Sequence, residues 1–131
     1  MKKFLVITFI LLCTFGFAVW ETVSVNSVYG DIEKYAAQVV EILDETDGNI
    51  SESDKLSDTA RKLEKKWLDF AAFANNFSNH TAVKNFTEKV VMLTAYIKTD
   101  SKTDAYATAR AIKALSGEMK NEALPLIGNL L

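Results

Sequence analysis

The chain has 131 residues, of which 49% are hydrophobic, and its formal net charge is −2. With one cysteine and one histidine, it excludes a disulfide framework, a cysteine-based zinc site and a metal centre built from several histidines. This composition is typical of one small domain with a hydrophobic core and argues against a disordered chain.

The amino end combines a short cationic head with a long apolar run. Lys2 and Lys3 precede residues 4–20, which contain no charged side chain. This pattern predicts an export signal that leaves its cationic end in the cytoplasm and delivers residues 21–131 outside it. The 17 residues of the run make about 25 Å of helix, which is the short limit for crossing a bilayer.

Two fates of this segment remain open. Gly16 and Ala18 are small residues at the positions that a signal peptidase recognises, so that cleavage after Ala18 would give a secreted domain. Against cleavage, Trp20 stands where an interfacial anchor would, and the apolar periodicity continues past it. We favour an uncleaved signal anchor in residues 1–20 that holds an extracytoplasmic domain, residues 21–131, at the cell membrane.

Beyond Trp20 the first segment has apolar residues at alternating spacings of three and four, which is typical of a helix. This seam comprises Val25, Val28, Ile32, Tyr35, Val39 and Ile42, widened by Ala36 and Leu43. The helix is expected to end near Gly48, because glycine is a good carboxyl-terminal stop. Gly30 weakens the helix and predicts a bend.

Three more helices are predicted. The second begins at Ser51 or Ser53 with a capping-box-like sequence, runs to about residue 78, and buries Leu56, Leu63, Trp67, Phe70, Ala74 and Phe77. The third follows a break at residues 78–81 and buries Val83, Phe86, Val90, Leu93 and Ile97. The fourth follows a turn at residues 99–104 and buries Ala105, Ala109, Ile112, Leu115 and Met119. Pro125 is expected to end it, so that the apolar tail packs back on the bundle.

The sequence therefore predicts an all-α fold: an amino-terminal transmembrane or signal helix followed by an antiparallel three- to four-helix bundle. Connections of about four to six residues force consecutive helices to run antiparallel. The turns near Gly48 and Asp100 should lie far from the membrane, and His80 and the carboxyl end should lie near it.

Residues 47–58 invite comparison with a calcium-binding loop, because oxygen-bearing side chains recur at ligand positions. However, Glu52 stands where the loop needs glycine, and Asp58 replaces the bidentate glutamate. We interpret the segment as a solvated turn and assign no metal site.

Charged residues cluster around this turn. The acidic members are Asp44, Glu45, Asp47, Glu52, Asp54 and Asp58, and the basic members that follow are Arg61, Lys62, Lys65 and Lys66. We interpret them as a solvated face, with contact to a protein partner as the alternative. Because Lys2 and Lys3 lie outside the domain, residues 21–131 carry a net charge of −4, which argues against binding of nucleic acid.

Four further residues are candidates for a site: His80, Trp67, Phe73 and Tyr96. His80 has no adjacent nucleophile or orienting partner in a recognisable motif, so we expect it to cap or pack a helix. Trp67 is expected to meet Phe70, Phe77 and Phe86 in a packed core, with a small-ligand cavity around Trp67 and Phe86 as the alternative. Phe73 and Tyr96 lie off the seams and are candidates for contact with a partner or with the tail. We assign no catalytic residue, cofactor or metal and expect no enzymatic activity.

The layout resembles a family of short bacterial proteins, mostly from Gram-positive spore-forming groups, catalogued as domain of unknown function 4363. The shared features are the lysine-flanked apolar helix, Lys65-Lys66-Trp67, Asn79-His80-Thr81, Tyr96-Ile97-Lys98, Asp104-Ala105 and the ending Gly128-Asn129-Leu130-Leu131. The chain departs from the family at Thr81-Ala82-Val83, where acidic and hydrophobic residues are usual. The resemblance implies a membrane-associated helical protein and assigns no functional residue.

Together these features predict a single-pass extracytoplasmic bundle that acts as an interaction or structural component of the cell envelope. The contact sites would be the charged turn, residues 44–58, and the apolar tail. A bundle that binds or senses a small ligand, secreted if the signal is cleaved, is the alternative.

Overall fold

The computed structural model describes residues 1–76 and 79–130, with side chains described through residue 121. These residues form four α-helices, one turn of 3₁₀ helix and no strand, so the prediction of an all-α fold is confirmed. In chain order the elements are α1 (Lys2–Glu45), η1 (Ile50–Glu52), α2 (Asp54–Ala74), α3 (His80–Lys98) and α4 (Lys102–Leu130).

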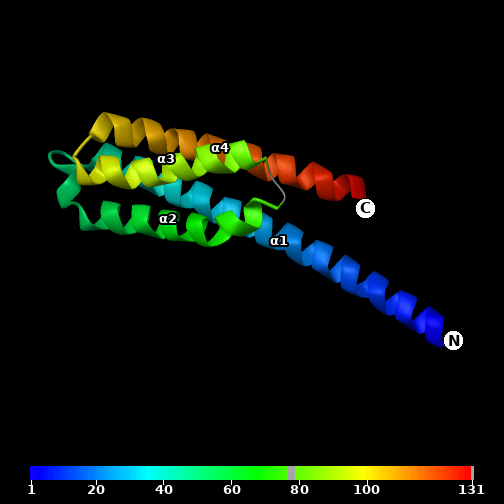
Figure 1. The fold of residues 1–131 in the computed structure, drawn as a ribbon. Coiled ribbons are helices and arrows are strands. Elements are labelled where there is room, and N and C mark those ends of the chain that lie inside the picture. The colour runs from blue at the N-terminus through cyan, green and yellow to red at the C-terminus, as the bar shows by residue number, and fades with distance from the viewer. Residues whose placement is uncertain (77–78, 131) are drawn as a thin grey trace.

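The helices form an antiparallel four-helix bundle (Figure 1). Helices α1 and α3 each pack against α2 and α4, so chain neighbours are also neighbours in space and α4 closes the bundle against α1. We call the end that holds η1 and the α3–α4 connection the distal end. The opposite end, which holds the α2–α3 connection and Trp20 of α1, is the proximal end. The apolar part of α1 extends beyond the proximal end, as Figure 1 shows.

The core consists of the inward stripes of all four helices. On α3 the buried set is Val83, Phe86, Val90, Leu93 and Ile97, as predicted. On α1 the buried set is Val25, Tyr29, Ile32, Ala36, Val39, Ile42 and Leu43. Tyr29 is therefore buried, and Val28 and Tyr35 only pack at the edge of the core. The buried stripe of α1 is therefore wider than an a/d seam and is centred on Tyr29, Ile32 and Ala36 rather than on Val28 and Tyr35.

Helix α1 is uninterrupted from Lys2 to Glu45. The expected boundary after residue 20 and the expected weak point at Gly30 both lie inside it, and Figure 1 shows no break at either place. Because Tyr29 and Ile32 are buried beside Gly30, packing offsets the cost of glycine in a helix, which is about 1 kcal/mol.

The connections follow the predicted signals closely. Gly48 has a φ of +95°, which is the left-handed conformation that glycine adopts without strain. Ser53 caps α2, and its side-chain oxygen accepts a hydrogen bond from the backbone N–H of Leu56 at 3.3 Å. Helix α2 ends at Ala74, four residues before the expected end at 78.

The expected helix stop at Pro125 is wrong. Helix α4 continues to Leu130, and Figure 1 shows its end running on in the direction of the helix at the proximal end. A proline removes one backbone donor and crowds one carbonyl, so its penalty is local and helical dihedrals resume on either side. The predicted packing of the tail side chains lies outside the described residues.

Candidate functional site

The apolar part of α1 is the first candidate site. Within the described residues, α1 is the one helix that is long and apolar enough to cross a membrane, judged by length and composition. Its most apolar window has a mean hydropathy of 2.1 and none of it is buried by the rest of the chain. Large apolar side chains from Phe4 to Val23 are exposed on every side of the helix. A soluble surface helix instead keeps one polar face.

An aromatic cluster connects this segment to the bundle. The ring centroids of Trp20 and Phe73 lie 6.1 Å apart in an edge-to-face arrangement, and Phe73 lies 5.4 Å from Phe70. Phe70 in turn meets Tyr29 at 5.6 Å. Phe73, which the sequence left unplaced, therefore joins α2 to α1 at the level of Trp20. Tyr96 packs at the edge of the core.

Trp67 is the centre of this cluster. It is fully buried, and its ring centroid lies 4.3 Å from that of Phe86. Its Nε1–H donates to Oγ1 of Thr87 at 2.9 Å, and the Thr87 hydroxyl donates to the backbone oxygen of Val83 at 2.8 Å. The rings of Trp67 and Phe86 thus pack against each other, and the buried indole N–H has a partner.

The distal end is held by polar groups. Oδ1 of Asp100 accepts hydrogen bonds from the backbone N–H groups of Ile50 at 2.6 Å and Ser51 at 3.3 Å. Nζ of Lys102 donates to the backbone oxygen of Thr46 at 2.7 Å. Asp100 adopts a φ of +59°, a conformation that aspartate tolerates better than most residues. These bonds join the α1–α2 and α3–α4 connections over the buried side chain of Ile50.

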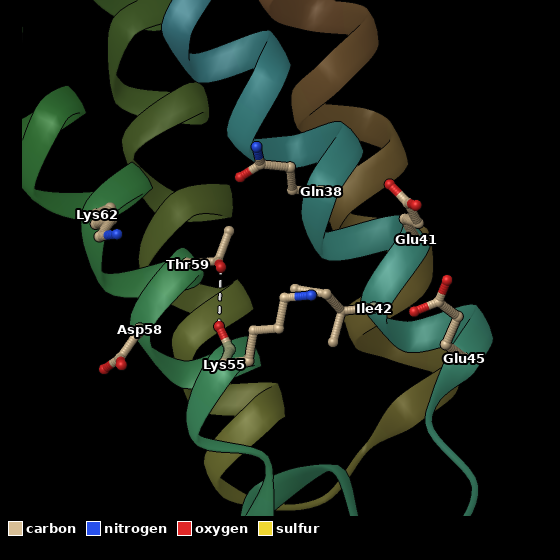
Figure 2. A pocket seen from close by; sticks show the side chains of 8 residues that line it. All are labelled: Gln38, Glu41, Ile42, Glu45, Lys55, Asp58, Thr59 and Lys62. Carbon is tan, nitrogen blue, oxygen red and sulfur yellow. Dashed lines mark hydrogen bonds between the residues drawn. The ribbon is translucent and has the colours of Figure 1, made fainter.

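A polar groove opens beside this junction, between α1 and α2 (Figure 2). Its volume is about 630 Å³, and it is lined by Gln38, Glu41, Ile42, Glu45, Lys55, Asp58, Thr59 and Lys62. Figure 2 shows the Lys55 side chain reaching from α2 toward Ile42 of α1. Thr59 Oγ1 donates to the Lys55 backbone oxygen at 2.8 Å.

The charges of this groove are not neutralised within it. Among the described residues, the ion pairs are Asp58 with Arg61 at 3.7 Å and Asp31 with Lys66 at 3.2 Å. The carboxylates of α1, Glu41 and Glu45, and the lysines of α2, Lys55 and Lys62, form no such pair. All four are exposed. The α1 side of the groove therefore presents two unpaired carboxylates to solvent, and the α2 side presents two unpaired lysines beside Asp58.

The remaining candidates are placed as follows. Residues 47–58 form the distal turn, η1 and the first turn of α2, and the described residues contain no cluster of three or more His, Cys, Asp or Glu that could hold a metal ion. His80 is exposed at the first position of α3. The cap is Asn79, whose Oδ1 accepts from the backbone N–H of Thr81 at 2.8 Å. The expected capping or packing role of His80 is therefore not observed.

Comparison of the chain with protein-family models, with curated proteins and with solved structures finds no match. The resemblance to domain of unknown function 4363 stays a prediction.

Proposed function

We propose that the chain is a single-pass membrane protein in which residues 4–20 are retained as an anchor. Its bundle lies outside the cytoplasm as an interaction or structural component of the cell envelope. The observation that carries the proposal is the continuity of α1, whose first part is apolar all round and whose second part is a wall of the bundle. The cationic Lys2 and Lys3 support a cytoplasmic amino end. The proposal assigns no catalytic residue.

Retention of the anchor is supported by the surroundings of Ala18. Cleavage after this residue would cut α1 two residues before Trp20, whose ring contacts Phe73. Mass spectrometry of the protein purified from membranes should give the mass of the full chain. A mass that lacks residues 1–18 would contradict the anchor and favour the secreted alternative.

The orientation is tested with a membrane-impermeant maleimide on intact cells. The variant Cys13→Ser, Asn49→Cys carries its only thiol in the exposed distal turn, and we expect it to be labelled without lysis. Labelling that requires lysis would place the bundle in the cytoplasm. The Cys13→Ser variant alone is the control for background reaction.

The proposed partner contact is the groove between α1 and α2. Unpaired charges of both signs favour a protein surface with the complementary pattern, because such charges select and orient a partner. Mild cross-linking in cells should give an adduct that Lys62→Glu weakens. Lys65→Glu is the matched control, since Lys65 is an equally exposed lysine on α2 outside the lining of the groove. Equal adducts from both variants would contradict a contact at this groove.

The alternative of a ligand-binding bundle has its own test. The full chain with Trp20→Phe keeps Trp67 as its only tryptophan, so its fluorescence reports on the core. A packed core should not respond to small metabolites. Saturable quenching of Trp67 would favour the ligand-binding alternative over the proposal.

A further inference from the structure

We infer that the proximal end of the bundle rests on the membrane surface, with the α2–α3 turn at the level of the lipid headgroups. The described members of this turn are Asn75, Asn76 and Asn79. The inference rests on the proposed anchoring of residues 4–20, but it holds for either side of the membrane.

The length of the anchor gives the first argument. Residues 4–20 make about 25 Å of helix, whereas the hydrocarbon core of a bilayer is about 30 Å thick. A span that is too short draws its flanking residues toward the hydrocarbon. The flanking residues here are the start of the bundle, because α1 continues without a linker from the apolar segment into the core.

The aromatic contact gives the second argument. Since Trp20 meets Phe73 edge to face at 6.1 Å, the end of α2 lies at the same height along α1 as Trp20. Trp20 is exposed at the end of the apolar segment, which is where tryptophan side chains meet the interface of a membrane. The turn that follows Phe73 is therefore held at the interface by the same contact.

The distribution of charge gives the third and independent argument. Apart from residues 4–20, the longest stretches without Asp, Glu, Lys or Arg are residues 22–30, 70–83 and 123–131. They are the start of the bundle part of α1, the α2–α3 connection with its flanks, and the end of α4. Their described residues, 22–30, 70–76, 79–83 and 123–130, belong to the proximal end (Figure 1).

Charged side chains are costly near the hydrocarbon, whereas neutral polar groups are tolerated at the interface. The uncharged stretches 22–30 and 70–83 begin directly after Glu21 and Asp69, and they contain the exposed Asn75 and Asn76 as well as core residues. The exposed Asn75, Asn76 and His80 supply polar groups that suit the headgroup region.

Spin labels measure this placement directly. The full chain, in a Cys13→Ser background, carries one label at Asn76, Asn49 or Ile10 and is reconstituted in vesicles of phosphatidylethanolamine with a minority of phosphatidylglycerol. Asn49 is the matched control for Asn76, because both are exposed asparagines in connections at opposite ends. Collision with oxygen reports on lipid, and collision with a water-soluble nickel complex reports on water.

We expect the nickel collision rate at Asn76 to be several-fold lower than at Asn49, and the oxygen collision rate to be higher. If protein alone shielded Asn76, both its nickel and its oxygen collision rates would be lower than at Asn49, and this result would contradict the inference. If Asn76 matches Asn49 while Ile10 is protected from nickel, the anchor is inserted but the bundle stands away from the membrane, which overturns this inference alone. If Ile10 is open to nickel, the proposed anchoring fails, and this inference fails with it.

Discussion

The two ends of the bundle are stabilised by different chemistry. At the distal end, Asp100 and Lys102 hold the connections through bonds to backbone groups, and charged side chains surround the junction. At the proximal end, the rings of Trp20, Phe73 and Phe70 join α1 to α2, and residues 22–30 and 70–83 carry no charged side chain. Hydrogen bonds thus hold the two connections together at the distal end, whereas ring contacts hold two helices together at the proximal end.

The two kinds of interaction differ in how much they depend on surrounding water. Charged hydrogen bonds at a loop are maintained in water because their exposed parts stay solvated. Aromatic contacts need no such solvation, and they keep their packing at a membrane interface. The two ends thus differ in chemistry, with hydrogen bonds of charged side chains at the distal end and ring contacts at the proximal end.

The largest effect is expected for the aromatic core that supports the proximal end. Trp67→Ala removes a fully buried ring, and the loss should be about 3–5 kcal/mol in the free energy of unfolding. Chemical denaturation of the full chain in detergent, followed by circular dichroism, measures it. Trp67→Phe, which keeps a ring against Phe86, should lose much less. Comparable losses would show that ring packing does not dominate this end.

A smaller loss is expected when the polar junction of the distal end is opened. Asp100→Ala removes the acceptor of the Ile50 and Ser51 N–H groups and should cost about 2 kcal/mol. Asp100→Asn keeps an oxygen acceptor and tolerates a positive φ, so it should lose less than half as much. The same denaturation assay compares them. If the two variants are equally destabilised, the hydrogen bonds do not hold this end.

The hydrogen bond from Trp67 Nε1–H to Thr87 Oγ1 tests whether a polar contact also contributes to the stability of the proximal end. Thr87→Val keeps the shape of the side chain but removes the acceptor of the Trp67 Nε1–H. A buried donor is then unsatisfied, and a loss of about 1 kcal/mol is expected. Thr108→Val on α4, a half-exposed helical threonine, is the control for the general effect of this substitution. A loss no greater than that of the control would make the bond incidental.

The smallest effect is expected for Gly30→Ala, which should raise stability. This variant tests whether α1 is a regular helix between the two ends. A Cβ added at Gly30 meets nothing within 4 Å, so Gly30→Ala should stabilise the chain by about 0.5–1 kcal/mol. Gly48→Ala is the counterpart at the distal turn and should destabilise by about 1 kcal/mol, because φ there is positive. Thermal melts of both variants suffice. Destabilisation by Gly30→Ala would mean that α1 must bend at this residue.

The sequence predicted the helices well wherever one face decides burial. All five core positions of α3 were predicted, because α3 has a single narrow stripe of apolar residues. Ser116 of α4 was missed although it is fully buried. Its hydroxyl donates to the backbone oxygen of Lys113 at 2.8 Å, and such a local bond lets a polar residue enter the core without a signal in the hydropathy pattern.

The candidate sites were harder to predict because they depend on residues distant in the chain. The Asp100 junction joins residues about 50 positions apart, and nothing in the local pattern marks Asp100 as more than a turn residue. The groove is formed by residues of both α1 and α2, so it cannot be predicted until the packing of these two helices is known. The Trp20–Phe73 contact likewise depends on the height at which α2 ends.

The unbroken course of α1 has a mechanical consequence. Since successive residues of a helix are related by a rotation of about 100°, the apolar segment, residues 4–20, cannot turn about its axis without turning Ile32 and Val39 out of the core. It also cannot tilt unless the bundle tilts with it, because both belong to one uninterrupted helix. If residues 4–20 span a bilayer as proposed, a change in bilayer thickness that tilts them would be transmitted along α1 and would displace the distal groove sideways.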